Sequence, residues 1–401
     1  MTEDSVTEIT TQSWGSRISS SLKGTLVGLL LVCVAIGVLW WNEGRAVKRA
    51  QALDEGAGQV VSITAESVDQ ANEGRLVHLS GHATTEEILT DPEFKVQARA
   101  IKLIRDVQMY QWREHKKTKT REKLGGGTET TTTYSYDRGW ERDLISSANF
   151  KQEEGHQNPS DMPYGEWLGQ ARDVSLGAFK LSPSLISEIN RSEPVSLNEN
   201  TQIHLPSRNS RLNGNEIYVG AYLDAPRIGD LRIRFSAVMP TDVSIVSVQR
   251  GHSLAPYLAS SGDTIELLEY GKVSAQQMFQ AAQDRNTMLT WIIRVGGFLF
   301  VLIGLRMLLG VLPILAAVVP ALGGLVDAAV GLIAFFLSAA ISLLTIATAW
   351  IFYRPILGIA LLASAILVTA GLVWAKAAKR QQAVPRMDTA AVSTPPPPPS
   401  V

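Results

Sequence analysis

The chain has 401 residues, enough for two domains, and its 37 basic and 38 acidic side chains nearly cancel, so bulk charge does not indicate a nucleic-acid partner. The single cysteine, Cys33, excludes an intrachain disulfide and a zinc site built on cysteines. Apolar residues make up 45% of the chain and are concentrated towards its two ends.

The first apolar run predicts a membrane anchor. Residues 24–41 carry no charge, and about 18 apolar residues suffice for a transmembrane helix. Lys23 precedes the run, and Trp40 and Trp41 end it as interfacial aromatic residues do. A cleaved signal peptide is the alternative, but the preceding 23 residues are long and partly acidic, and Trp-Trp-Asn-Glu is a poor cleavage site. We therefore expect residues 1–23 to be a cytoplasmic tail and 24–41 an uncleaved helix.

Residues 42–290 contain no further apolar run of spanning length and read as a β-rich, non-cytoplasmic domain. "GQVVSITAESV" and "GRLVHLSGHAT" alternate as strands do. The segment 101–115 and "TETTTTYSYDRGW" predict a long β-hairpin. Its tip, "KKTKTREKLGGG", is basic and then glycine-rich. The tip either contacts anionic headgroups or a partner, or is a solvated loop.

A second apolar block, 291–375, is too long for one membrane span. Ser274 and Gln277 fit a capping box, and nothing interrupts a helix from there to residue 312. Prolines and glycines then predict three spans, 291–312, 326–352 and 356–375. The alternative is two spans with a re-entrant hairpin around 313–324. The basic, proline-rich tail 376–401 is placed in the cytoplasm. The expected fold is an α+β membrane protein with four transmembrane helices, one N-terminal and three C-terminal, flanking a β-rich extramembrane domain.

Several long segments resemble one family. They are "NEGRAVK", "NEGRLVH", "LIRDVQMYQW", "YSYDRGWERDLISSANF", "GHQNPS", "IGDLRIRF", "RGHSLAPY", "SGDTIELLEYG" and "IFYRP". In this order they are similar to the transmembrane protein 43 (LUMA) family, over nearly the whole of 24–375. The resemblance implies four spans and a large domain between the first two. It also implies a role in organising membrane proteins and in oligomerisation, in the endoplasmic reticulum and inner nuclear membrane of eukaryotes. A bacterial member would lie in the cytoplasmic membrane with its large domain in the periplasm. The N-terminal 23 residues, the C-terminal tail and the hairpin tip depart from the family pattern.

The end of the first span supplies most of the candidate site residues. We expect a structural collar at the membrane exit, formed by Trp40, Trp41, Asn42, Glu43, Gly44 and Arg45. Glu43 is expected to pair in the headgroup layer with Arg294 or Arg354, and the proposed topology favours Arg354. Arg306 lies deep in the second span, where a charge has a functional or pairing role.

The remaining motifs give little indication of a metal or catalytic site. His78 and His82 are four residues apart on a predicted strand, so we expect no metal site there. "GHQNPSD", 155–161, is either a structured turn or a catalytic loop. We expect no catalytic residue, cofactor or metal.

The leading function is a non-enzymatic membrane scaffold whose partners are the lipid bilayer, further copies of itself and other membrane proteins, but not nucleic acid. An oligomeric channel or transporter is the alternative, suggested by Arg306 and the broken segment 313–324. An envelope lipid-modifying enzyme, suggested by the histidines and residues 155–161, is the third.

Overall fold

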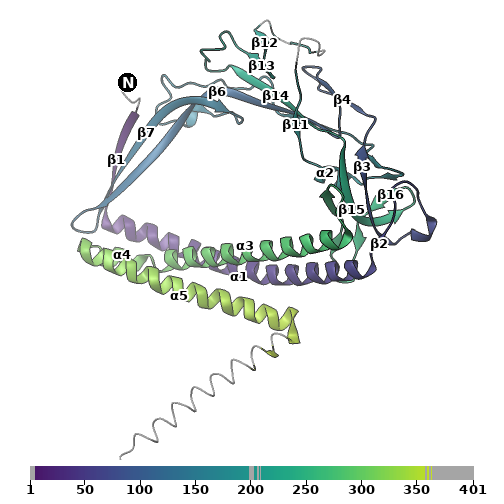
Figure 1. Ribbon diagram of the computed structural model, residues 1–401. Coiled ribbons are helices and arrows are strands. Elements are labelled where there is room, and N and C mark those ends of the chain that lie inside the picture. Colours follow the sequence, from purple (N-terminus) through teal and green to yellow (C-terminus); the bar gives the residue numbers. More distant parts are fainter. Residues whose placement is uncertain are drawn as a thin grey trace, which may run out of the picture. The chain divides into compact units, whose positions relative to one another are not determined.

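The computed structural model describes residues 5–356, apart from 198–202, 206 and 208, together with residues 359, 360 and 363. The chain divides into two compact units, Met1–Ser342 and Leu343–Val401, which are described separately. The first unit contains a β-rich domain and most of the apolar helices (Figure 1). The expected α+β membrane fold is therefore confirmed in class.

Three helices in the described part of the chain are long and apolar enough to cross a membrane, one near the N-terminus and two towards the C-terminus. The first is α1 (Trp14–Gln59). The second joins α3 (Ala275–Leu309) to the short α4 (Val311–Ala316), and the third lies in α5 (Pro320–Tyr353). The expected fourth span, 356–375, falls almost wholly outside the described residues.

Local sequence explains where these helices begin and end. The Ser13 hydroxyl accepts a hydrogen bond from the Ser16 N–H at the start of α1. Ser274 and Gln277 form the predicted capping box at the start of α3. This helix ends slightly earlier than expected, at Leu309 with Gly310 as its C-cap rather than at residue 312. The segment 313–324 completes α4 and begins α5, so it forms no separate hairpin.

An eight-stranded sheet contains the predicted hairpin. Its main strand order is β1-β7-β6-β14-β13-β12 (Figure 1). In addition, β8 pairs with β6 and β11 pairs with β14. The bounds are β1 (Ser5–Gln12), β6 (Lys102–Glu122), β7 (Thr128–Glu141), β8 (Trp167–Gln170), β11 (Glu193–Pro194), β12 (Ser210–Asn213), β13 (Glu216–Val219) and β14 (Leu231–Val238). β6 and β7 pair in one continuous antiparallel ladder from Met109–Glu141 to Glu122–Thr128.

The N-terminal segment differs from its prediction. Residues 5–12 were expected in a cytoplasmic tail, on the side of the membrane opposite to the domain. Instead they form the edge strand β1 of the domain's sheet, in antiparallel register with β7 from Ser5–Ser135 to Gln12–Thr128. Helix α1 follows directly, beginning at Trp14 rather than at residue 24. The sheet therefore reaches back to the start of the first apolar helix.

A seven-stranded sheet forms the rest of the domain. Its order is β19-β15-β16-β10-β9-β3-β2, and its centre is the antiparallel pair of β3 and β15. The bounds are β2 (Val61–Ser62), β3 (Leu76–Thr84), β9 (Ser175–Leu176), β10 (Phe179–Lys180), β15 (Thr241–Arg250), β16 (Ser253–Ala255) and β19 (Leu267–Tyr270). The remaining elements are β4 (Ile88–Thr90) with β5 (Gln97–Arg99), β17 (Tyr257–Leu258) with β18 (Thr264–Ile265), and helix α2 (Pro183–Glu188).

One of the domain's apolar cores fastens α1 and α3 to this second sheet. Leu53 of α1 and Phe279 of α3 are buried together with Val246 and Ile265. A Cβ at Gly56 would lie 2.5 Å from the Ile265 Cδ1 atom, so a larger residue here would displace core side chains. The two long helices thus pass from the apolar segments directly into the folded domain.

Candidate functional site

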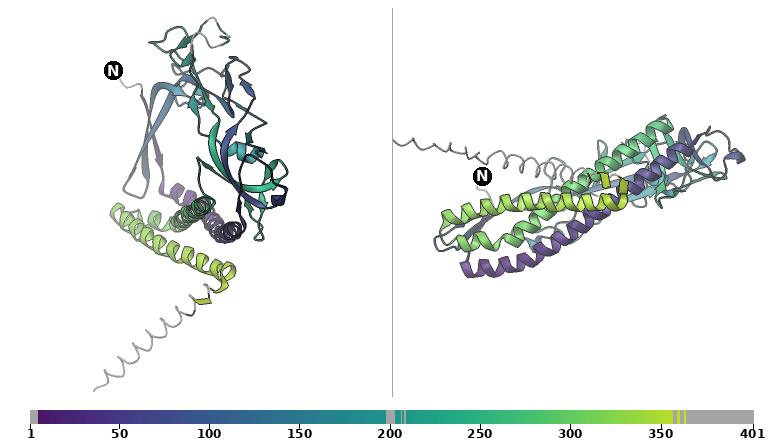
Figure 2. Two further views of the ribbon diagram at one scale, coloured as in Figure 1. Left: turned by 45° about the vertical axis from the view of Figure 1, so that its right-hand side comes forward. Right: turned by 90° about the horizontal axis from the view of Figure 1, so that it is seen from below.

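The candidate site is built where α1 and α3 lie side by side and antiparallel (Figure 2). Small residues bring their backbones together in the apolar part: a Cβ at Gly28 would lie 2.5 Å from the Gly304 carbonyl oxygen. Further along, Leu39 is fully buried against Gly297. One turn beyond Leu39 the interface becomes polar.

Glu43 and Arg294 form the centre of this polar interface. The Arg294 Nε donates to Oε1 of Glu43 and its Nη2 donates to Oε2, both at 2.7 Å. The Glu43 side chain is only 2% exposed, and the Arg294 guanidinium lies over the Trp291 ring. Such a two-pronged pair fixes both distance and rotation of the helices. The preference for Arg354 was wrong, because the partner that the structure gives Glu43 is Arg294.

A second set of hydrogen bonds extends the interface by one turn towards the domain. The Asn42 amide donates to the Thr290 carbonyl at 3.2 Å. The Arg45 guanidinium donates to Asn42 Oδ1, Thr290 Oγ1 and Asn286 Oδ1. Asn286 in turn donates to the carbonyl of Ala46 at 3.0 Å. We call Asn42, Glu43, Arg45, Asn286, Thr290 and Arg294 the polar clamp.

The predicted collar residues lie at the contact between α1 and α3. Glu43 and Arg45 were expected at the headgroup level and Glu43 in an ion pair; Asn42, Glu43 and Gly44 are buried, and Asn42 and Glu43 bond to α3. Trp41 is exposed on the helix surface and Trp40 is half-buried, as suits aromatic side chains at a bilayer boundary. The motif is therefore an interhelical joint beside an aromatic boundary. Of the clamp residues on α3, Arg294 was named as a possible partner of Glu43, whereas Asn286 and Thr290 escaped prediction because no motif marks them.

A second charged pair lies nearer the other end of the bundle. Arg306 of α3 donates from Nη2 to both carboxylate oxygens of Asp327 on α5, each at 3.0 Å. Both side chains are about half exposed on the isolated chain. Arg306 thus has the pairing role that was one of its two expected roles. Arg354 belongs to the second unit, where its backbone N–H donates to the Trp350 carbonyl.

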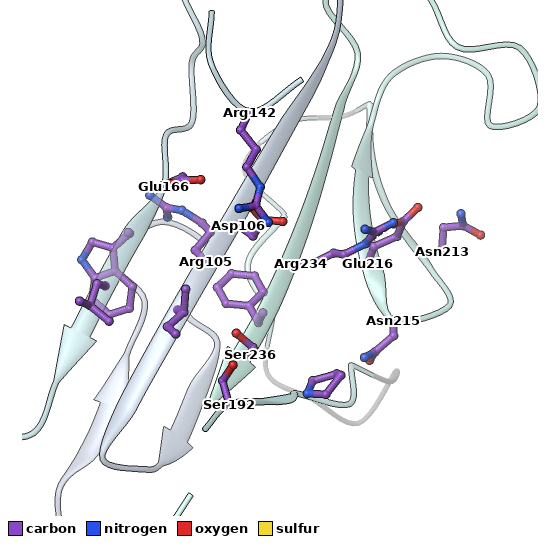
Figure 3. A pocket seen from close by; sticks show the side chains of 15 residues that line it. Arg105, Asp106, Arg142, Glu166, Ser192, Asn213, Asn215, Glu216, Arg234 and Ser236 are labelled. Atoms are coloured by element: carbon purple, nitrogen blue, oxygen red, sulfur yellow. Dashed lines mark hydrogen bonds and ion pairs between the residues drawn. The ribbon is translucent and has the colours of Figure 1, made fainter. Parts of the chain in front are cut away.

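The sheet also carries an open groove of about 940 Å³. Two charged pairs line it: Arg234 lies beside Glu216, and Arg142 lies beside Asp106 (Figure 3). Arg105 at the floor holds the buried carboxylate of Asp91 with two contacts near 3.0 Å. The lining comprises Ile104, Arg105, Asp106, Arg142, Glu166, Trp167, Leu168, Ser192, Pro194, Asn213, Asn215, Glu216, Arg234, Phe235 and Ser236.

The histidines on strand β3 have separate structural roles. The Nε2 atom of His78 is 2.8 Å from the Val273 carbonyl, whereas His82 pairs with Asp242. Within the described residues, no group of three or more histidine, cysteine, aspartate or glutamate side chains is placed to hold a metal ion.

Residues 155–161 form a structured turn, as one of the two hypotheses held. The Asn158 side chain accepts from the Trp112 N–H at 2.7 Å and donates to the Trp112 and Ile145 carbonyls, so it continues the strand pairing of β6. His156 is buried and stacked on Tyr136, with ring centroids 3.9 Å apart.

Sequence reasoning missed one joint entirely. At the start of α1, the Trp14 indole donates to the Ile314 carbonyl at 2.8 Å. Arg17 donates to the Gly126 carbonyl and to the Glu122 carboxylate. These contacts, here called the N-terminal clasp, fasten the tip of the β6–β7 hairpin to the bundle.

Comparison with known proteins agrees with the resemblance in the motifs. A family model described as Transmembrane protein 43 matches residues 109–355. Transmembrane protein 43 of Rattus norvegicus is 36% identical over 351 residues, covering 85% of this chain and 87% of the relative. The Homo sapiens protein is 34% identical with the same coverage, and the Drosophila melanogaster homolog is 33% identical over 84% of this chain and 90% of its own. No solved structure matches the chain.

Proposed function

Because the chain belongs to the transmembrane protein 43 family, we propose that it is a non-enzymatic membrane scaffold that gathers proteins or lipids around its β-rich domain. Its family and its three apolar helices make it an integral, multi-pass membrane protein. The scaffold role, self-association and the choice of partners are the proposed part.

One observation carries the proposal: α1 and α3 are unbroken from their apolar segments into the domain. Each helix buries side chains in the domain core, Leu53 from α1 and Phe279 from α3. Between that core and the apolar segments, the Glu43–Arg294 pair prevents the two helices from sliding or rotating against each other. A domain held in this way is a rigid platform, as a scaffold requires.

The apolar helices offer a second line of support. On the isolated chain, Leu26 of α1 is 71% exposed and Phe336 of α5 is 68% exposed, among many similar side chains. Helix surfaces of this kind contact lipid or other transmembrane helices. The platform therefore has a large surface for partners within the bilayer.

The other two hypotheses have less support. The channel hypothesis depended on Arg306 and on the broken segment 313–324. Arg306 is engaged by Asp327, and residues 313–324 form the end of α4 and the start of α5. The enzyme hypothesis depended on His156, which is packed beneath Tyr136 in a structured turn. We do not propose either function.

The proposal is tested by extracting the full chain with its surrounding bilayer into polymer-bounded discs and identifying what accompanies it. We expect further copies or specific membrane proteins or lipids to remain bound through repeated purification. Discs that contain one chain and only bulk lipid would contradict the scaffold. The compartment, whether endoplasmic reticulum and inner nuclear membrane or a bacterial cytoplasmic membrane, rests on family membership alone.

A further inference from the structure

The outer part of the β6–β7 hairpin carries its positive charge on one face. Alternate residues of β6 are basic, and alternate residues of a strand point to the same side of the sheet. The series is Arg113, His115, Lys117, Lys119 and Arg121, and Lys123 follows just beyond the strand. We call this side of the three strands β1, β7 and β6 the basic face.

Neighbouring strands neutralise only the two ends of this face. Asp137 pairs with Arg113 and His115, and Glu129 pairs with Lys123. In the middle, Lys117 and Lys119 lie opposite threonines, Thr133 and Thr131. The next strand across presents Thr7 and Ile9 there, and Ile9 is 62% exposed. Neither lysine makes an ion pair within the described residues, so their charge is available to a partner.

The opposite face of the same strands is acidic and already occupied. It carries Glu8, Glu114 and Glu122 against a single lysine, Lys116. Lys151 pairs with Glu8, and Arg17 pairs with Glu122. The protein therefore covers its acidic face and leaves the basic face open.

The hairpin tip lies against the membrane helices. The Gly125 N–H donates to the Val318 carbonyl, in the apolar connection between α4 and α5, at 3.4 Å. The N-terminal clasp holds the next residue, Gly126, beside the Trp14 ring. Leu124, at the very tip, is 89% exposed. An apolar side chain so exposed, next to basic residues and to apolar helices, is typical of a loop that enters the bilayer interface.

We propose that this tip binds anionic lipid headgroups, with Leu124 entering the acyl boundary and Lys117 and Lys119 contacting the phosphates. Juxtamembrane lysines gain favourable energy from an anionic leaflet, and that gain falls off within a Debye length. The clasp keeps the basic face close to the bilayer, which is why we assign it to a lipid surface. The exposed leucine beside apolar helices favours a lipid surface over a soluble acidic protein. The inference goes beyond the scaffold role and does not depend on it.

The test uses the full-length protein with Cys33→Ala and Leu124→Cys, carrying an environment-sensitive fluorophore at position 124. It is reconstituted in phosphatidylcholine alone or with added phosphatidylglycerol, each with and without a nitroxide-labelled lipid. We expect lipid quenching of the fluorophore, strengthened by phosphatidylglycerol and weakened by salt. Lys117→Gln with Lys119→Gln should lower the apparent affinity for phosphatidylglycerol about tenfold or more.

The control removes the same charge elsewhere. Arg250→Gln with Lys272→Gln, at two exposed positions on β15 and just before α3, should leave the quenching unchanged. An unquenched label, as a protein-binding tip would give, overturns the proposal. Quenching that changes neither with the anionic lipid content nor with substitution of the two lysines also overturns the proposal. Unchanged elution in size-exclusion chromatography confirms that each variant is folded.

Discussion

Glu43 on α1 and Arg294 on α3, 251 residues apart in the sequence, meet through two hydrogen bonds of 2.7 Å at a point where the carboxylate is almost completely buried. An ion pair in this position gives little net stability compared with an apolar contact, but loss of one partner strands the other as a buried charge. The pair therefore acts as a registration device between the helices that carry the domain.

Removing one partner of the Glu43–Arg294 pair should destabilise the protein more than exchanging both partners. We expect Glu43→Gln or Arg294→Gln to lower the free energy of unfolding by about 3–5 kcal/mol, because a charge is left buried and unpaired. Glu43→Arg with Arg294→Glu should recover part of that loss. Thermal unfolding in detergent measures both. Arg354→Gln is the control and should match the wild type; if it is as damaging as Arg294→Gln, the pairing described here is incorrect.

Glycines at the apolar α1–α3 contact should not tolerate a side chain. A Cβ at Gly304 would lie 2.8 Å from the Gly28 carbonyl oxygen, so Gly304→Leu forces the helices apart. Overpacking of this kind costs about 1–3 kcal/mol. Gly296 lies on the same helix with nothing within 4 Å of its Cβ position, and Gly296→Leu should be neutral in the same unfolding measurement. Equal effects of the two substitutions would contradict the close contact.

The edge strand β1 gives a prediction about connectivity. Thr7 and Thr133 are directly opposite each other in the β1–β7 ladder. In a Cys33→Ala background, cysteines at these two positions should oxidise to a disulfide, since directly paired side chains lie on the same face and need only a small backbone adjustment to reach disulfide geometry. Cysteines at Thr7 and Thr132 point to opposite faces and should stay reduced, as a gel-shift assay would show. Failure of the first pair to cross-link would mean that residues 5–12 do not belong to this sheet.

Low pH should destabilise the β6–β7 hairpin. The Arg113 guanidinium, with a smaller contribution from His115, holds the pKa of Asp137 below its usual range. In the unfolded chain this aspartate titrates at about pH 3.9. Its contribution to the stability of the folded protein is therefore complete above that pH and is lost as the pH falls through the lower pKa of the folded state. The hydrogen-exchange protection factors of residues 128–141, corrected for the slower intrinsic exchange in acid, should therefore fall on acidification below about pH 4. Asp137→Asn should weaken the hairpin at neutral pH and remove this part of the pH response.

Elements with strong local signals could be predicted from the sequence. Long alternating runs gave the β6–β7 hairpin, and Ser274 with Gln277 gave the start of α3, because both signals are complete within a few neighbouring residues. Strand β1 could not be foreseen in this way. It is short, threonine-rich and only partly alternating, and its partner strand lies more than a hundred residues away.

The candidate site was likewise only partly predictable from the sequence. An aromatic boundary at Trp40 and Trp41 followed by polar residues indicated a structural collar at 42–45, but not its packing against α3. The choice of partner depended on which helix packs against α1, and close packing at Gly28 and Gly304 accompanies that choice. No pattern in the sequence distinguishes these glycines from Gly296, so the proposed topology decided the choice and favoured Arg354 over Arg294.

The central claim, that this chain is an assembling scaffold with its domain fixed to its helices, is tested most directly by expressing two differently tagged copies in one membrane. Purification through the first tag should recover the second in the wild type. The second tag should be recovered poorly from Glu43→Gln. Its recovery should be restored in the Glu43→Arg, Arg294→Glu double variant, since the swap restores the buried pair. If the second tag is never recovered and each purified particle is one 43.6 kDa chain without protein or specific lipid partners, the account is contradicted.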